Sequence, residues 1–208
     1  NGLYTKIMRN RPQGTMALLE DIAVPMEKLG GVCTDLQELF DKHHYDGAVI
    51  FGHAKYGNIH FLVTEDFAGE ESLNRYDQFT EDMVDLVLRE QGTLKAEHGT
   101  GRIMSPFVQR QYGDDLYQAM VDVKDACDPN RILNPGTIIT DDPQLHLKYI
   151  KPTETVRDII DDCVECGYCE PVCPSQHLTT TPRQRIVIQR AIAACEASGA
   201  YDLAERLK

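Results

Sequence analysis

The stretch FGHAKYGNIHF, residues 51–61, decides the fold. The apolar runs that overlap its two ends, residues 46–54 and 57–65, are expected to form two buried strands. Between them the letters KYGN supply a tight turn, in which Gly57 and Asn58 tolerate a positive φ. The stretch therefore predicts a β-hairpin that carries one histidine on each side of its turn.

Working outward from the hairpin, strands and helices are expected to alternate. A strand at 15–25 precedes a helix whose apolar residues recur from Leu29 to Phe40. A helix at 76–90 follows the hairpin, then a short strand at 92–102 that ends in a glycine-rich loop, and a helix at 114–127. That last helix is expected to turn a set of apolar residues inward, namely Leu116, Met120, Val123 and Cys127. This order predicts an α+β fold, an antiparallel sheet covered on one face by helices.

Three segments follow from the composition along the chain. Residues 1–139 are expected to form the α+β domain. Residues 140–158 are polar, contain two prolines, and are interpreted as a linker. Residues 159–208 are expected to form a small helical module, with a final helix that opens at Pro182.

The overall composition excludes some classes of function. The chain has 208 residues, of which 33 are acidic and 21 basic, so its formal net charge is -12. A general nucleic-acid binder would need a basic stripe, so no nucleic-acid partner is expected. No apolar run is long enough to predict a transmembrane helix. The chain begins in mid-pattern without Met, and it is interpreted as a fragment of a longer protein.

A second motif, DDCVECGYCEPVCPSQ, occupies residues 161–176. Its four cysteines, Cys163, Cys166, Cys169 and Cys173, have the spacing C-x2-C-x2-C-x3-C-P of bacterial ferredoxins. Zinc usually takes two well-separated cysteine pairs, so the spacing favours a 4Fe-4S cluster. Such a tight group of cysteines is typical of a reducing compartment, which predicts a cytoplasmic protein; attachment to the surface of the inner membrane is left open.

The ferredoxin spacing also predicts where each thiol is used. In two-cluster modules the fourth cysteine binds the other cluster, so Cys163, Cys166 and Cys169 would serve one cluster and Cys173 a second. No second C-x2-C-x2-C run occurs in these residues. The remaining ligands are therefore expected outside this sequence, and the clusters to be incomplete in the fragment alone.

Histidines and a glutamate form a third constellation. His53 and His60 stand on either side of the turn, and a hairpin brings such positions close together. KAEHGTGR adds Glu97 and His98. Two imidazoles and a carboxylate are a reasonable ligand set for a divalent metal such as zinc, and His98 beside them could act as a general base. The alternative is that these histidines have only a structural role.

Taken together, EDIAVP, FGHAKYGNIHF, AEHGTGR and DPNRILNPGTI resemble the C-terminal substrate domain of FAD-linked oxidases. This group includes D-lactate, glycolate and D-2-hydroxyglutarate dehydrogenases. The cysteine segment resembles an iron-sulfur module that is fused to the flavoprotein in one subgroup. The resemblance covers roughly residues 15–190 and implies a ferredoxin-like α+β domain, with FAD held mainly by a domain outside this sequence.

The resemblance also implies roles for individual residues. His53, His60 and Glu97 match the divalent-metal ligands of the family, and His98 matches the histidine that takes the hydroxyl proton. Asn134, in LNPG, matches a position packed near the flavin ring. Two departures stand out: Lys55-Tyr56 replaces a common Gly-Asp in the turn, and Leu62 replaces an Asn that some members have.

Three functions are consistent with these patterns. The first is an FAD-dependent D-2-hydroxy acid dehydrogenase that passes electrons to 4Fe-4S clusters, with the fragment alone inactive and the electron acceptor unspecified. The second is an iron-sulfur electron-transfer subunit without its own substrate, which would have no need for the histidine constellation. The third is a structural zinc protein that uses the four cysteines.

Overall fold

The structure is a computed structural model that describes residues 2–67, 69–150 and 154–208, with only the backbone of residues 2–4. The chain divides into two bodies. The first, here called the sheet body, comprises Leu18–Val63 and Ala68–Ile150; the second, called the cysteine body, comprises Asn1–Ala17, Thr64–Phe67 and Lys151–Lys208. The domain boundaries inferred from the sequence, at 139 and 158, stay a prediction.

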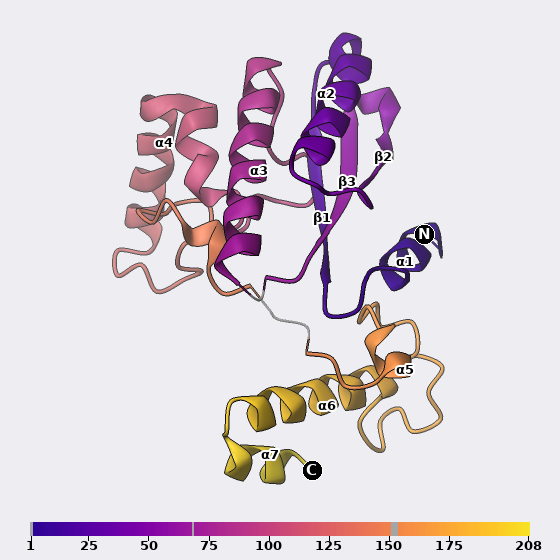
Figure 1. The fold of residues 1–208 in the computed structure, drawn as a ribbon. Helices are drawn as coiled ribbons and strands as arrows, with labels where there is room; N and C mark the ends of the chain where they lie inside the picture. Colours follow the sequence, from indigo (N-terminus) through magenta and orange to yellow (C-terminus); the bar gives the residue numbers. More distant parts are fainter. Residues whose placement is uncertain (1, 68, 151–153) are drawn as a thin grey trace. The chain divides into compact units, whose positions relative to one another are not determined.

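The sheet body is built on a three-stranded sheet, shown in Figure 1. The strands β1 (Met16–Ala23), β2 (Val49–His53) and β3 (Asn58–Glu65) lie in the order β1-β3-β2. Strands β2 and β3 pair antiparallel, with Phe51 opposite His60 and His53 opposite Asn58. A 3-10 turn, η2 (Ala54–Tyr56), joins them, and Gly57 closes it with φ of 66°. The predicted hairpin is confirmed.

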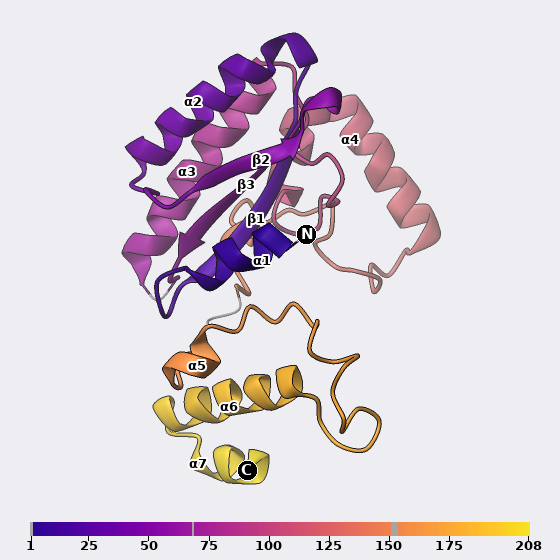
Figure 2. The ribbon, with the colours of Figure 1, turned by 90° about the vertical axis from the view of Figure 1, so that its right-hand side faces the viewer.

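Two helices, α2 (Leu29–Lys42) and α3 (Glu70–Arg89), cover one face of this sheet (Figure 2). Successive residues of a strand point to opposite faces. Accordingly Ile59, Phe61 and Val63 of β3 join the hydrophobic core with Phe40 of α2 and Phe79 of α3. The α+β fold with helices on one face is thus confirmed, and the intervening residue His60 lies on the face away from the helices.

The predicted strand at 92–102 is wrong. Only Thr93 makes a ladder contact, an isolated antiparallel bridge to Ala23. Beyond it the backbone N–H groups of Ala96, Glu97 and His98 point to a side-chain carboxylate, that of Asp21, instead of to a neighbouring strand. This segment is therefore an irregular loop that side chains hold in place.

The helix predicted at 114–127 forms as part of α4 (Val108–Cys127), which follows η3 (Ser105–Phe107) and bends at Gly113. The expectation that its apolar residues point inward is wrong for three of the four, since only Met120 is half-buried. Leu116 is 58% and Val123 65% exposed, and Cys127 is also exposed. Beyond the bend, the helix presents these residues outward instead of to the core.

The segment predicted as a linker is partly packed. A 3-10 turn, η4 (Leu145–Leu147), buries Leu145 and His146 within the sheet body. Nε2 of His146 lies 2.7 Å from Oδ1 of Asp77 in α3, and its ring contacts Phe107. The chain is therefore fixed to α3 as far as this turn. Residues 151–153 of the predicted linker lie outside the described residues.

The cysteine body contains the helices α1 (Gly2–Arg9), α5 (Asp158–Asp161), α6 (Pro182–Ala197) and α7 (Tyr201–Leu207). The predicted start of α6 at Pro182 is confirmed. Thr181 and Gln184 form a reciprocal capping box there, and Pro182 occupies the first helical position, where its missing N–H costs no hydrogen bond.

Gly57 provides a test of the hairpin. A Cβ atom at this position would lie 1.9 Å from the carbonyl oxygen of Val24, and the residue has a positive φ. Gly57→Ala is expected to lower the free energy of unfolding by at least about 2 kcal/mol, measured by urea denaturation. Gly31→Ala in α2 is the control, since nothing lies within 4 Å of its added Cβ. Equal stability of the two variants would contradict the assigned turn.

Candidate functional site

Three side chains converge on the sheet face opposite the helices. His53 ends β2, His60 lies in the middle of β3, and Glu97 comes from the loop that follows Thr93. Oε1 of Glu97 lies 2.8 Å from Nε2 of His60 and 3.4 Å from Nε2 of His53. The structure thus brings together the three residues that the sequence analysis assigned as ligands of a divalent metal.

His98 completes the cluster. Its ring stacks on the ring of His60 with centroids 4.9 Å apart, and its Nε2 lies 3.9 Å from Oε1 of Glu97. Its other nitrogen, Nδ1, lies 3.6 Å from Oδ1 of Asp21. His98 is therefore placed between a buried carboxylate on one side and the three-residue ligand set on the other.

The spacing of the ligand atoms suits a metal ion. Nitrogen and oxygen ligands about 2 Å from a tetrahedral zinc lie roughly 3.3 Å apart. The ligand atoms of His53, His60 and Glu97 all lie within 4.8 Å of one another, and so do those of a second, overlapping group, Asp21, His60 and His98. The residues present therefore fit a small divalent ion. The group of His53, His60 and Glu97 is more exposed than the group of Asp21, His60 and His98.

The electrostatics of His60 favour metal binding. Burial, followed by the neighbouring His98, lowers the pKa of His60 below its ordinary value. The lowered pKa favours the neutral form of His60, which is the form that binds a metal. In the described part of the chain, Nδ1 of His60 and Oδ1 of Asp21 are buried without a hydrogen-bond partner. Two such atoms in one cluster are costly unless a further group satisfies them.

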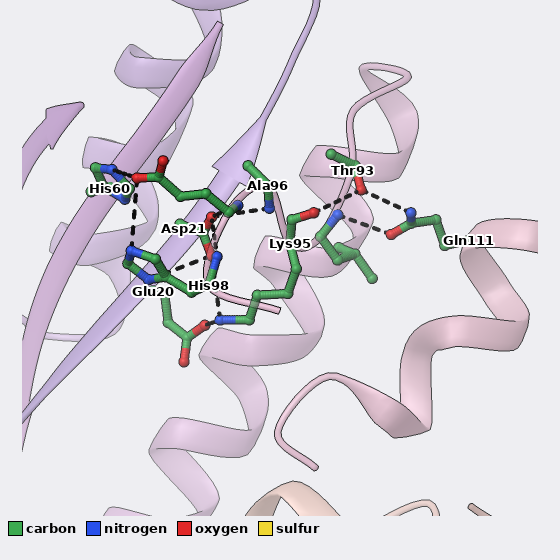
Figure 3. A network of polar contacts seen from close by, with 10 residues as sticks. Glu20, Asp21, His60, Thr93, Lys95, Ala96, His98 and Gln111 are labelled. Atoms are coloured by element: carbon green, nitrogen blue, oxygen red, sulfur yellow. Dashed lines mark hydrogen bonds and ion pairs between the residues drawn. The ribbon is translucent and has the colours of Figure 1, made fainter. Parts of the chain in front are cut away.

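The loop that carries Glu97 and His98 is held by β1 (Figure 3). Oδ2 of Asp21 accepts the backbone N–H groups of Ala96 at 3.0 Å, Glu97 at 2.6 Å and His98 at 3.3 Å. Beside it, Nζ of Lys95 donates to the buried carboxylate of Glu20. Adjacent carboxylates of one strand thus fix two successive parts of the loop.

A glutamine from α4 anchors the start of this loop. Oε1 of Gln111 accepts the N–H of Leu94 at 2.9 Å, and its Nε2 donates to Oγ1 of Thr93 at 2.9 Å. Glu20, Asp21 and Gln111 were not predicted from the sequence. The signal that could have revealed the first two is an adjacent pair of carboxylates between apolar residues of a strand, in EDIAVP.

The four cysteines of the second motif are all free thiols, in the cysteine body. Cys166 and Cys169 are exposed, whereas Cys163 and Cys173 are half-buried. Among the described residues, no three of these sulfur atoms gather within 4.8 Å of one another. The segment is therefore not preformed around a single metal ion, and the assignment of Cys163, Cys166, Cys169 and Cys173 as 4Fe-4S ligands stays a prediction.

The backbone at the first cysteine is nevertheless well held. The carbonyl oxygen of Cys163 accepts hydrogen bonds from Nη2 of Arg190 at 2.9 Å and from Nη2 of Arg11 at 3.4 Å. Nη1 of Arg190 also pairs with Glu165, and Arg190 is 8% exposed. Two guanidinium groups therefore fix where the cysteine run begins.

With this geometry in view, the family of the chain can be given. Residues 5–138 match the family described as FAD linked oxidases, C-terminal domain. The chain belongs to this family. In this FAD-linked oxidase domain the hairpin, the loop of Glu97 and His98, and the segment up to Ile138 all lie inside the matched range.

Several relatives carry names of hydroxy acid enzymes. The chain is 30% identical over 126 residues to glycolate oxidase subunit GlcD of Bacillus subtilis, covering 60% of this chain and 26% of that protein. It is 30% identical over 126 residues to the mitochondrial D-lactate dehydrogenase [cytochrome] of Arabidopsis thaliana, covering 61% and 22%.

A third relative matches more of the chain. D-2-hydroxyglutarate dehydrogenase of Escherichia coli is 28% identical over 195 residues, covering 82% of this chain and 19% of that protein. An alignment of that extent necessarily passes residue 138 and enters the cysteine segment. The chain spans about a quarter or less of the length of these three relatives.

Asn134 was predicted to lie near the flavin of such a protein. It is exposed, has a positive φ of 44°, and lines a cavity together with Lys124 and Arg131. Among the described residues it makes no contact with the histidine cluster. The cofactor role of Asn134 stays a prediction.

The segment before Asn134 depends on a buried carboxylate. Asp128 accepts the N–H of Ile132 at 3.1 Å and of Leu133 at 2.8 Å, and Nζ of Lys124 at 2.6 Å. Asp128→Ala is expected to speed hydrogen exchange at the amides of Ile132 and Leu133, measured by mass spectrometry. Asp125→Ala, which removes only an exposed ion pair to Arg131, is the control and should leave these amides protected.

The same hydrogen bonds make the protection of the Ile132 and Leu133 amides depend on pH. Lys124, followed by the N–H of Leu133, lowers the pKa of Asp128 below its ordinary value. The folded protein therefore favours the charged form of Asp128. The protection is present above the ordinary pKa of aspartate, and it is lost as the pH falls through the lowered pKa of Asp128. Protection that did not change in acid would contradict this role.

Proposed function

We propose that the parent protein is an FAD-dependent D-2-hydroxy acid dehydrogenase that forms a 2-oxo acid and passes electrons to 4Fe-4S clusters. The observation that carries the proposal is the convergence of His53, His60 and Glu97, with His98 directly beside them. Ligands and base come from three separate segments, which only the folded sheet body brings together.

His53, His60 and Glu97 would hold a divalent metal, which supplies a Lewis acid for the hydroxyl and carboxylate oxygens of the substrate. The chain as a whole has a net charge of -12, which does not attract an acidic substrate. A cation held at this cluster would give the site the local positive charge that recognition of a carboxylate needs.

His98 would act as the general base. Its imidazole accepts the proton of the substrate hydroxyl as the carbon–hydrogen bond breaks and the carbon–oxygen double bond of the 2-oxo acid forms. FAD, when bound, supplies the acceptor for the hydride and can release the two electrons singly. The hydroxyl proton would thus be held by this chain, and the two electrons of the carbon–hydrogen bond would leave with the hydride.

The cysteine run would form part of the electron exit. Its spacing assigns Cys163, Cys166 and Cys169 to one cluster and Cys173 to a second. The alignment with a D-2-hydroxyglutarate dehydrogenase that enters this segment supports a link between the run and hydroxy acid oxidation. An electron-transfer subunit without a substrate is the weaker alternative, because it would have no need for the histidine cluster.

The proposal is tested with the full-length holoprotein. D-lactate, glycolate and D-2-hydroxyglutarate, with L-lactate and L-2-hydroxyglutarate as controls, are mixed with it anaerobically and flavin reduction is followed by stopped flow. At least one D-acid or glycolate is expected to reduce the flavin. Glu97→Gln should lose bound divalent metal and slow reduction about 100-fold or more. His44→Asn, at an exposed histidine outside the cluster, is the control. No reduction by any acid would overturn the proposal.

The electron exit has its own test. Cys166→Ser in the full-length protein is expected to leave flavin reduction by the substrate unchanged and to block reoxidation of the flavin by the downstream acceptor. Cys127→Ser, at an exposed thiol of the sheet body, should change neither step. If Cys166→Ser behaves like Cys127→Ser and retains its full iron content, the cysteine run is not the electron exit.

A further inference from the structure

We propose that Asp21 is a positioning residue for His98. One of its carboxylate oxygens holds the loop of Glu97 and His98, and the other keeps the proton of the His98 imidazole on Nδ1, so that Nε2 is free to accept the substrate proton. The inference rests on the proposed function, since His98 needs a defined tautomer only if it acts as a base.

The first oxygen acts on the backbone. Oδ2 of Asp21 accepts three successive N–H groups, those of Ala96, Glu97 and His98 (Figure 3). Hydrogen bonds to a charged acceptor are stronger than those between neutral groups. The side chain of Asp21 is fully buried, so water does not compete for this oxygen. The loop is therefore tied to β1 at the two residues that carry the chemistry.

The second oxygen faces the His98 ring. Oδ1 of Asp21 is buried and has no hydrogen-bond partner in the described part of the chain. Two nitrogen atoms lie near it, Nδ1 of His98 at 3.6 Å and Nζ of Lys95 at 3.8 Å. Lys95 already donates to Glu20. Nδ1 of His98, the nearer of the two nitrogens, is therefore the available partner for Oδ1.

This arrangement selects one tautomer. A carboxylate attracts the N–H of an imidazole, so it favours the form in which Nδ1 of His98 carries the proton. The lone pair then belongs to Nε2, which lies on the side of Glu97, 3.9 Å from its Oε1. The base would thus point toward the ligand set, where a substrate hydroxyl would be held.

The rival role for Asp21 is that of a metal ligand. The group of Asp21, His60 and His98 is also compact enough for an ion. In that case His98 would be a ligand and could not accept a proton. The two roles differ in one measurable quantity, the metal content of an Asp21 variant.

Asp21→Asn in the full-length holoprotein separates them. The amide oxygen of the variant can still accept the three backbone N–H groups, which turns the amide NH2 toward Nδ1 of His98. An NH2 group donates, so the imidazole proton is forced onto Nε2. Flavin reduction at a saturating concentration of the best D-2-hydroxy acid is expected to slow about 100-fold or more, as when a triad carboxylate is replaced by an amide. Bound metal is expected to stay at the wild-type level.

A double-mutant cycle shows whether Asp21 acts through His98. Asp21→Asn combined with His98→Ala is expected to be no slower than His98→Ala alone, because the base is already gone. Gln111→Ala loosens the start of the same loop without contacting His98. Gln111→Ala is expected to slow flavin reduction by a smaller factor. In the double variant with His98→Ala, the two factors are expected to multiply. If Asp21→Asn slows flavin reduction by the same factor in the wild type and in His98→Ala, Asp21 has only a structural role and the inference is overturned.

The remaining outcomes are equally decisive. If wild-type protein is reduced by a hydroxy acid and Asp21→Asn is reduced as fast, or loses its metal, only the inference fails. If no acid reduces the wild type, the proposed function fails and the inference with it.

A second measurement applies if the variant does not fold. Solid-state NMR of the wild type with 15N-labelled histidine rings reports the tautomer of His98, whose signals are assigned by difference from His98→Ala. A proton on Nε2 would overturn the inference.

Discussion

The two-residue period of β3 is the constraint on which the rest of the structure depends. Residues 59, 61 and 63 are buried among the helices, so residue 60 must face the other way. A shift of register by one residue would move His60 into the hydrophobic core and Phe61 onto the site. The pairing of Phe51 with His60 and of His53 with Asn58 then places both histidines on that same face. Packing on one face of the sheet therefore determines the chemistry on the other.

The loop of Glu97 and His98 is fixed by a different interaction, the burial of acidic side chains beside it. A carboxylate without partners is costly to bury, and it becomes acceptable only when hydrogen bonds and a cation satisfy it. Asp21 meets this condition through three backbone N–H groups, and Glu20 through Lys95. If the loop moved away, both carboxylates would be left buried without partners. The cost of that state keeps the loop, and with it the side chain of Glu97, in one conformation.

The sequence was sufficient for the features that local rules control. The hairpin followed from the turn letters and two apolar runs, and the start of α6 from Pro182 after Thr181. The convergence of His53 and His60 followed from their places on either side of that turn, whereas their use as metal ligands stays a prediction. The loop at 92–102 could not be predicted, because it is held by side chains of β1 that are more than 70 residues away in the sequence. The outward face of Leu116 and Val123 was missed because periodicity shows which residues share a face, not whether another element covers that face.

The exposure of the four side chains in the cluster is uneven. The side chain of His60 is 6% exposed, that of His98 34%, that of Glu97 50% and that of His53 60%. His60, in β3, is thus the least accessible of the four, and His53, beside the turn of the hairpin, is the most accessible. An ion held by the outer ligands would keep coordination positions open on the accessible side, as catalytic metal sites require. Because Asp21 of β1 holds the backbone of the loop, His98 can remain oriented while the opposite side of the cluster stays open.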